Sequence, residues 1–411
     1  ETEESAGIAH MLEHMLFKGT KTLGTTDYAA EKPLLDRIEA TAQALAEEKA
    51  KRDRADRSRI ARLEKELAEL EKTAGRYSVR EEFFEIYARN GGADFNAFTS
   101  KDGTTYLVSL PSNKLELWAA IESDRMVNPV LREFYSERSV VMEERRRSNE
   151  NQPEGRLWEH FLATAFVAHP YGQPIIGWMS DIEHLTRTRA EAFLRRHYAP
   201  ANAVVAVVGD IDPDRTIALA ERYFGSIPPG VPVPPVPVEE PRQAGEKRIT
   251  LRLDSEPHLL IGFHKPVHPD PDDDVFEVIE MILTDGKTSR LHRRLVQELE
   301  LATDVSAFTA PGRRYPNLFV IAATPRSPHT PREVEVAVTA ELERLKNEPV
   351  TGRELARILN RLEYEEVRQM SSNRGLAHLL TEYEAVTGSW RTLIDHRRRI
   401  SAVTPADVMR V

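Results

Sequence analysis

The sequence predicts an α+β fold built from two related domains. Seven prolines fall between residues 227 and 241, and this composition favours an extended, semi-rigid linker. Residues 280–288 resemble residues 13–21 when the glycines of the two stretches are aligned, which indicates a duplicated unit. We therefore expect a first domain at residues 1–226, a linker at 227–243 and a second domain at 244–411.

The first domain is expected to begin with a helix at residues 7–18, followed by an N-cap cluster at residues 25–27. Apolar residues then recur at intervals of three and four on two segments between residues 33 and 76, which predicts an antiparallel helical hairpin. The hairpin either docks a partner, or covers a site as a lid, or is a solvated elaboration without a specific role. Its seam residues are Leu35, Ile38, Ala42 and Leu45 on one helix and Ile60, Leu63, Leu67, Leu70 and Ala74 on the other.

The rest of the first domain mixes strand and helix patterns. Gly91 and Gly92 precede an alternating stretch at residues 95–110, which predicts a strand. His169 falls in a loop, where it either lines a substrate cleft or has a structural role. The other predicted elements are helices at residues 115–126, 188–197 and 213–224, a charged helix ended by Pro153, and a strand at residues 203–208.

The motif with the clearest chemistry is His-x-x-Glu-His, formed by His10, Glu13 and His14. On a helix the two histidines lie one turn apart on one face, with Glu13 beside them. Two neutral imidazoles at this spacing can bind one Zn²⁺, and the carboxylate can take a proton from a bound water. This order of residues is the inverzincin motif. The alternative is an amphipathic helix with two buried, hydrogen-bonded histidines.

A third ligand is needed for a zinc site, and a later charged helix offers one. Glu137 and Glu144 are seven residues apart, so they share nearly the same helix face, with Val140 and Val141 between them. Carboxylates on an apolar stripe are costly to bury unless a positive charge compensates them. Zinc would compensate Glu144, and Glu137 can accept the free N–H of a ligating histidine. The alternative is a solvated helix with Glu–Arg pairs.

Four stretches, taken in order along the chain, resemble the pitrilysin/insulinase family of zinc peptidases. They are the segment from Thr2 to Thr20, Asn96-Ala97-Phe98-Thr99-Ser100, the segment containing Glu137 and Glu144, and His169-Pro170-Tyr171-Gly172. The resemblance covers most of the 411 residues. It implies that each chain holds one Zn²⁺ on His10, His14 and Glu144, with Glu13 as general base and Glu137 orienting a ligand.

The resemblance also bears on the fold and on substrate binding. It implies two α/β-sandwich domains, each an antiparallel sheet packed with helices, and identifies the hairpin at residues 33–76 as an insertion. The second domain would bind no zinc, because Glu277 and Met281 stand where the first domain has its histidines. Asn96, Ala97, Phe98 and Thr99 would form a strand edge that receives an extended peptide, the alternative being an ordinary internal strand.

One departure from the family pattern concerns transition-state stabilisation. Active members carry an Arg and a Tyr seven residues apart, in a later domain or a partner subunit, which steady the scissile carbonyl and its oxyanion. The corresponding positions here are Val296 and Thr303. We therefore expect a homologous second subunit to supply this clamp, in a heterodimer or a homodimer. Arg313, Arg314 and Tyr315 lie nearby but at a different spacing.

Composition excludes several classes of function. The chain has 56 basic and 66 acidic residues and a net charge of −10, which argues against nucleic-acid binding. It has no cysteine and therefore no disulfide or thiol chemistry. The longest apolar run, at residues 203–208, is far too short to span a membrane. We expect both termini to be incomplete, including the end of the second domain, so a missing targeting segment is uninformative.

Together these observations predict a zinc-dependent endopeptidase that hydrolyses peptides or unfolded polypeptide segments. Family habit favours an extracytoplasmic bacterial location, periplasmic or secreted, with the cytoplasm as the alternative. Two other functions stay open: a catalytically silent scaffold subunit, and a binding module with a structural zinc in which the hairpin binds the partner. Three protein ligands leave a fourth position for water, which favours the enzyme.

Overall fold

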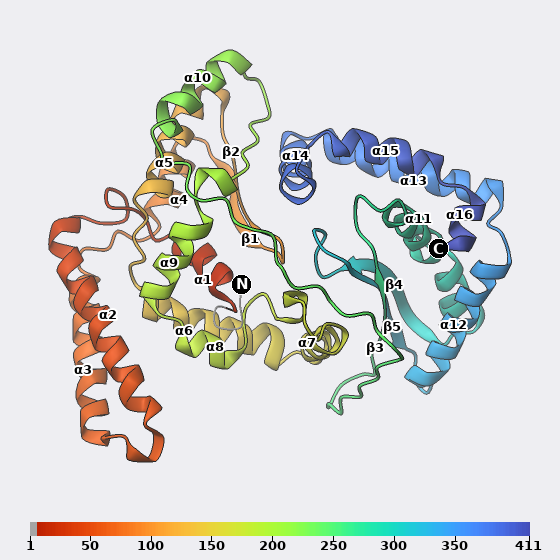
Figure 1. Cartoon of the computed structure of the whole chain (residues 1–411), viewed down its shortest axis with the longest axis horizontal. Helices are drawn as coiled ribbons and strands as arrows, with labels where there is room; N and C mark the ends of the chain where they lie inside the picture. Colours follow the sequence, from red (N-terminus) through yellow and green to blue (C-terminus); the bar gives the residue numbers. More distant parts are fainter. Residues whose placement is uncertain (1–5) are drawn as a thin grey trace. The chain divides into compact units, whose positions relative to one another are not determined.

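The computed structural model describes residues 6–411, which divide into two compact units (Figure 1). The first unit comprises the described residues up to Ser148 together with Gln173–Ala203 and Gly209–Pro237. The second comprises Asn149–Gly172, Val204–Val208 and Val238–Val411. The first residues of the segment from Thr2 to Thr20, which contributed to the family resemblance, lie outside the described residues.

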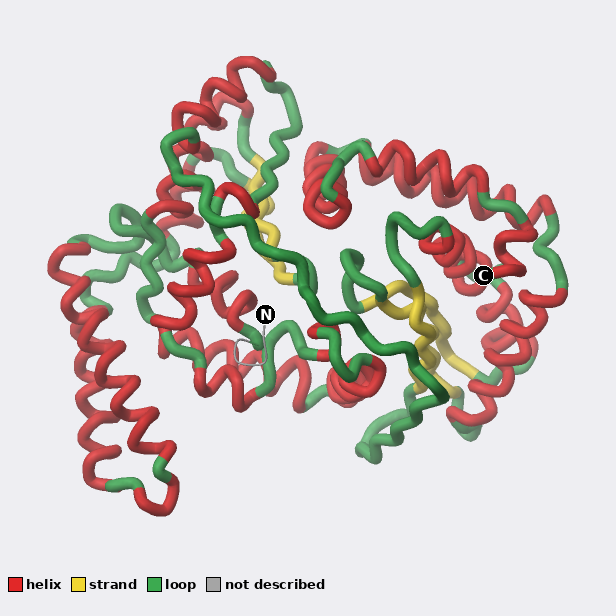
Figure 2. Tube along the Cα trace, in the orientation of Figure 1, coloured by secondary structure: helices red, strands yellow, loops and turns green. Residues whose placement is uncertain are grey.

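The predicted α+β class is confirmed. Both units are rich in helix, and the strands form two small antiparallel sheets, one of two strands and one of three (Figure 2). Along residues 6–411, no helix is both long enough and apolar enough to cross a membrane.

The first unit has nine α-helices and one β-hairpin among its described residues. In that hairpin, β1 (Ala93–Thr99) pairs with β2 (Thr104–Ser109), and Thr99 lies opposite Thr104. The predicted single strand at residues 95–110 is therefore two strands, because a turn closed by Ser100 N–H donating to Gly103 O separates them. The helices are α1 (Ile8–Met15), α2 (Tyr28–Ala50), α3 (Arg57–Ala74), α4 (Glu82–Arg89), α5 (Leu115–Val127), α6 (Phe134–Arg145), α8 (Met179–His184), α9 (Arg187–His197) and α10 (Pro213–Phe224).

Helices α2 and α3 form the predicted helical hairpin and run side by side (Figure 1). The first helix begins at Tyr28, before the expected start, because the Asp27 carboxylate caps it by accepting from Ala30 N–H. Near the base of the hairpin the seam residues are buried, and toward the turn they are half-buried. The buried ones are Leu35, Ile38, Ala42, Leu70 and Ala74.

Two local predictions in or near the first unit are wrong. Residues 203–208 form no strand, because none of the described strands pairs with them; Val204 and Val205 are 40% and 58% exposed. Hydrophobicity alone predicted that strand, whereas a strand also needs a neighbour for its backbone groups. Val140 does not share the buried stripe of α6, since it is 52% exposed while Val141 is fully buried.

Residues 149–172 group with the second unit, whereas the predicted boundaries put them in the first domain. This segment contains α7 (Pro153–Ala165), and its apolar side chains Leu162 and Phe166 pack with Leu318 and Val320. The proline-rich stretch is divided as well, since residues up to Pro237 belong to the first unit. Packing between segments distant in sequence, which a local pattern does not encode, accounts for the difference.

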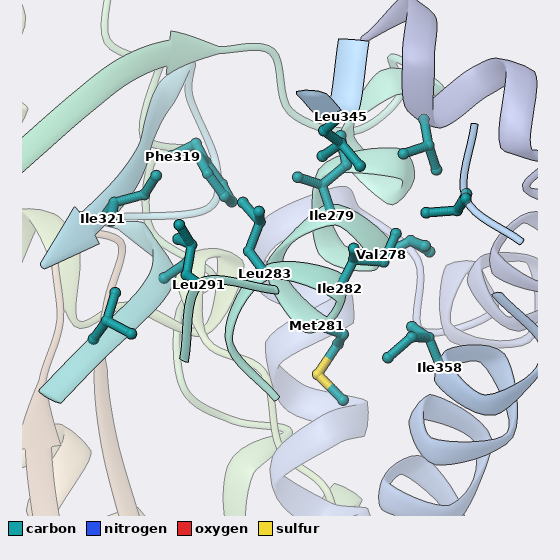
Figure 3. Packing of buried hydrophobic residues seen from close by; sticks show 14 of the residues in the cluster. Val278, Ile279, Met281, Ile282, Leu283, Leu291, Phe319, Ile321, Leu345 and Ile358 are labelled. Atoms are coloured by element: carbon teal, nitrogen blue, oxygen red, sulfur yellow. The ribbon is translucent and has the colours of Figure 1, made fainter. Parts of the chain in front are cut away.

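The second unit is built around its three-stranded sheet, with strand order β3-β5-β4. The sheet packs against α11, whose residues Val278, Ile279 and Ile282 lie at the centre of the core (Figure 3). Besides α7 the elements are β3 (Leu259–Lys265), α11 (Asp272–Thr284), β4 (Ala302–Ala310), β5 (Asn317–Pro325), α12 (Pro331–Asn347), α13 (Gly352–Met370), α14 (Asn373–Thr387), α15 (Thr392–Ala402) and α16 (Pro405–Arg410).

His396 joins α15 to α11 in the second unit. Its Nδ1 lies 2.8 Å from the Asp274 carboxylate and its Nε2 lies 3.3 Å from that of Glu277. Burial lowers the pKa of His396, but the hydrogen bonds to Asp274 and Glu277 outweigh burial and raise the pKa to about 9. Because this pKa exceeds the unfolded value of about 6.5, the charged pair stabilises the unit fully below pH 6.5 and is lost as the pH rises through 9.

A His396→Gln variant is therefore expected to be less stable than the wild type by about 2 kcal/mol at pH 6, with the difference shrinking toward zero at pH 9.5. Urea unfolding of both proteins at each pH measures this difference. A His329→Gln variant is the control, because His329 forms an exposed pair with Glu333. A difference between His396→Gln and wild type that does not change with pH would contradict the assignment.

Candidate metal centre

Helix α1 carries two rows of side chains with opposite properties. The helix begins after Gly7, whose φ of 84° favours glycine and where a Cβ would collide with the Ile176 carbonyl. Because both rows recur every three or four residues, each occupies one side of the helix. The buried row, packed in the core of the first unit, consists of Ile8, Met11, Leu12 and Met15, and the polar row consists of His10, Glu13 and His14.

Helices α1 and α6 bring three metal-binding side chains together. Ligand atoms of His10, His14 and Glu144 all lie within 4.8 Å of one another, and among the described residues this is the group suited to a metal ion. His10 Nε2 is 3.6 Å from one Glu144 oxygen, and His14 Nε2 is 3.4 Å from the other. The structure thus assembles the three predicted ligands, although 130 or more residues separate Glu144 from the histidines.

Charge at this group suits a cation. Burial lowers the pKa of His10, so its imidazole is neutral near pH 7. The hydrogen bond with His14 holds the pKa of Glu144 below its usual range, so Glu144 is a carboxylate. Burial lowers the pKa of His14, but hydrogen bonds to Glu137 and Glu144 outweigh it and raise the pKa to about 9. A metal ion would therefore displace a proton from His14 when it binds.

Glu137 orients His14 from the first turn of α6. Its Oε1 lies 2.9 Å from His14 Nδ1, so Nδ1 donates and Nε2 is turned toward Glu144. The other oxygen of Glu137 lies 2.5 Å from Lys18 Nζ, which is also 3.5 Å from Glu133. Burial raises the pKa of Glu137, but His14 and Lys18 outweigh it and lower the pKa to about 2. Glu137 is therefore charged at any physiological pH.

Glu13 lies beside the histidines on α1 and contacts the β-hairpin. Thr99 Oγ1 donates a hydrogen bond to Glu13 Oε2 at 2.5 Å. Glu13 is half-buried and does not belong to the group of His10, His14 and Glu144. A carboxylate next to the ligands but outside their group can accept a proton.

The loop after α1 is held by one buried ion pair. Arg132 and Glu31 are each 1% exposed, and Arg132 Nε lies 2.9 Å from the Glu31 carboxylate. The same guanidinium donates to the carbonyl oxygens of Lys18, Thr20 and Leu23. Because Arg132 lies two residues before α6, this pair fixes the start of the helix that carries Glu144 relative to the end of α1.

The predicted substrate strand is β1, in which Asn96 pairs with Leu107 of β2. Its side chains alternate: those of Asn96 and Phe98 are exposed, Ala97 is buried, and Thr99 contacts Glu13. Binding of substrate along this strand stays a prediction.

The other residues singled out from the sequence lie in the second unit. His169 is buried, its Nδ1 accepts from Tyr171 N–H, and its ring packs against Tyr315. Val296 packs against the hydrophobic core, and Thr303 is the second residue of β4, where it donates to Thr324 O. These contacts describe structural roles within that unit.

Sequence reasoning missed two polar contacts of this centre. Lys18 lies four residues after His14, but its pairing with Glu137 joins positions that are 119 apart along the chain. The Thr99–Glu13 hydrogen bond spans 86 positions. The signal that could have found Lys18 is its place four residues after His14, because i and i+4 share a face on the predicted helix at residues 7–18.

Comparison with known proteins identifies the class. The family model described as insulinase (peptidase family M16) matches residues 1–44 and 65–178, and a second, described as the peptidase M16 inactive domain, matches residues 184–362. The two matches together cover most of the chain and place its fold in a class of peptidases. The chain belongs to the insulinase family, peptidase family M16, as the sequence predicted. Residues 45–64, which the first model leaves out, form the outer part of the α2–α3 hairpin.

Individual relatives agree with this family. The chain is 28% identical to the zinc protease PqqE of Helicobacter pylori, over its whole length and 81% of that protein. It is 33% identical to an uncharacterised zinc protease of Mycobacterium leprae, over 52% of the chain and 49% of that protein. The crystal structure of a Helicobacter pylori protease matches all of the chain with a TM-score of 0.81 and 26% identity, over 87% of that structure. The periplasmic protease PqqL of Escherichia coli shares the fold, with a TM-score of 0.64 at 17% identity, over all of this chain and 41% of that one.

Proposed function

We propose that this protein is the zinc-bearing subunit of an endopeptidase that hydrolyses peptides or unfolded polypeptide segments. The observation that carries the proposal is the convergence of His10, His14 and Glu144 within 4.8 Å, with Glu13 beside them on the same helix. Membership of a peptidase family and relatives named zinc proteases support it.

The residues present fit a zinc ion. Two imidazole nitrogens and one carboxylate are a donor set of catalytic zinc sites, in which the fourth position is left to water. Zinc held there would lower the pKa of its water ligand toward about 7 and polarise a carbonyl group. Glu137 and Lys18 supply the outer support that such sites use to orient a histidine ligand.

The chain's own residues would transfer the protons and bind the substrate. Glu13 accepts the proton of the attacking water and afterwards delivers a proton to the leaving amine. Main-chain groups of β1, from Asn96 to Thr99, align an extended peptide by hydrogen bonds, a mode that tolerates varied side chains. Such binding suits peptides and unfolded segments, because a folded substrate presents no free extended strand.

Stabilisation of the oxyanion is proposed to come from a homologous second subunit. At the positions where active family members have the Arg/Tyr clamp, this chain has Val296 and Thr303, neither of which carries a guanidinium or phenol. Arg313 is engaged by Glu382. The partner is either a different homologous chain or a second copy of this one. An extracytoplasmic location also remains a prediction, as does a docking role for the α2–α3 hairpin.

The test is zinc-dependent cleavage of a quenched peptide library by the chain alone and with any homologous subunit that co-purifies. Activity that appears only with the partner, disappears with a chelator and returns with zinc would support the proposal. Activity of the chain alone would mean that residues of this chain itself stabilise the oxyanion. A tightly bound zinc without cleavage in either format would instead favour a silent scaffold or binding subunit.

Substitutions of Glu137 and Glu144, both on α6, should differ in their effect on zinc affinity. Glu137→Gln is expected to weaken zinc binding roughly 10–100-fold, because it removes the partner that orients His14. Glu144→Gln should weaken it further, because it removes a charged ligand. Competition with a chromophoric chelator measures both, and Glu143→Gln is the control, since Glu143 is exposed on the same helix. Equal zinc affinity of Glu144→Gln and wild type would contradict the ligand assignment.

A further inference from the structure

We infer that Thr99 is a positioning residue for Glu13, holding the general base in the orientation that proton transfer requires. The inference rests on the proposed function, because it assigns Glu13 the role of base. Its evidence is the hydrogen bond of 2.5 Å from Thr99 Oγ1 to Glu13 Oε2, which joins the end of β1 to the middle of α1.

The direction of this hydrogen bond follows from the groups around it. A carboxylate only accepts, so the single hydroxyl proton of Thr99 points to Glu13. Thr99 Oγ1 lies 3.1 Å from Thr104 Oγ1, directly across the β1–β2 ladder, and must therefore accept from it. The hydrogen bond from the Thr104 hydroxyl therefore holds the Thr99 side chain in the rotamer that reaches Glu13.

The alternation of β1 separates Thr99 from its neighbours in the predicted substrate strand. Phe95, Ala97 and Thr99 point to one face of the strand, and Phe17 of the segment after α1 packs on Phe95 at that face. Asn96 and Phe98 point to the opposite, exposed face. The side chain of Thr99 therefore contacts Glu13 of α1, and a substrate on β1 would contact only the main chain of Thr99.

Holding Oε2 leaves Oε1 as the oxygen that exchanges the proton. A glutamate side chain has three rotatable bonds, and catalysis needs its carboxylate within about 0.5 Å of the productive position. One short hydrogen bond from a β-branched residue on a strand removes most of this freedom. Without it Glu13 would remain present but spend much of its time in unproductive rotamers.

Thr99→Val removes the hydroxyl and keeps the shape, whereas Thr99→Ser keeps the hydroxyl. We expect Thr99→Val to lower kcat roughly 10–100-fold while KM and zinc content stay within about twofold of wild type, and Thr99→Ser to recover kcat to within about threefold. Adding Thr99→Val to Glu13→Gln should cause no further loss, because the two residues act as one unit. Thr105→Val, on the opposite face of β2, is the control.

Two results would overturn the inference: a raised KM with unchanged kcat in Thr99→Val, which would mean substrate binding, or equal loss in the valine and serine variants. Crystal structures of zinc-loaded wild type and Thr99→Val provide a second measurement that needs no activity. The side chain of Glu13 should adopt one ordered conformation in the wild type and several rotamers in Thr99→Val. If wild type cleaves nothing, the proposed function fails, and the rotamers of Glu13 still decide the role of Thr99.

Discussion

Replacing Glu13 with glutamine is expected to abolish peptide hydrolysis while zinc stays bound. Glutamine keeps the size of the side chain and can still accept from Thr99, but it cannot take a proton from water. The loss of a general base typically lowers the rate by roughly 10²–10⁴-fold. Zinc content should not change, because Glu13 lies outside the group formed by His10, His14 and Glu144.

The comparison requires equal zinc occupancy in all samples, measured by elemental analysis beside the cleavage rate. Glu85→Gln is the matched control, since Glu85 is exposed on α4 and pairs only with Arg89 in the described interactions. More than about a tenth of wild-type activity in Glu13→Gln would contradict its role. Loss of zinc from Glu13→Gln would mean that Glu13 is a ligand.

Arg132→Met is expected to destabilise the first unit by roughly 3–5 kcal/mol. The substitution leaves the Glu31 carboxylate buried without its charged partner, and removing one member of a buried ion pair typically costs this much. It also removes the donor to three carbonyl oxygens in the loop after α1. Urea unfolding of metal-free protein, followed by circular dichroism, measures the change in the free energy of unfolding.

The double variant Arg132→Met/Glu31→Gln isolates the charge effect. Because it buries no uncompensated carboxylate, it should recover a large part of the stability lost in Arg132→Met. Arg187→Met is the control, since Arg187 pairs with the half-exposed Asp36 near the surface. A loss below about 1 kcal/mol in Arg132→Met would show that the pair does not hold the loop.

The features that the sequence predicted correctly are those encoded within one or two helical turns. The spacing of His10, Glu13 and His14 predicts a shared face because α-helix geometry is regular, and the same holds for Glu137 and Glu144. The N-cap cluster at residues 25–27 was predicted for a similarly local reason, and in the structure Asp27 is the residue that caps the helix. The family resemblance then connected the two helices, which periodicity alone does not do.

The features that were missed depend on contacts between distant segments. Residues 203–208 are apolar enough for a strand but have no paired neighbour among the described strands. Helix α7 groups with the second unit because Leu162 and Phe166 find their partners on β5. The bonds from Thr99 to Glu13 and from Lys18 to Glu137 likewise cross about a hundred positions, so no local pattern contains them.

The buried row and the polar row of α1 share one helix and are separated only by an angle of rotation about its axis. Each added or removed residue turns everything after it by about 100°. A single insertion after Met11 would therefore carry His14 into the buried position that Met15 occupies, away from Glu144, and bring Glu13 into the place of His14. Substitutions alter one position at a time, whereas a change in length alters both rows together. Among chains that keep this centre, we expect the segment Ile8–Met15 to vary in composition but to accept neither insertion nor deletion.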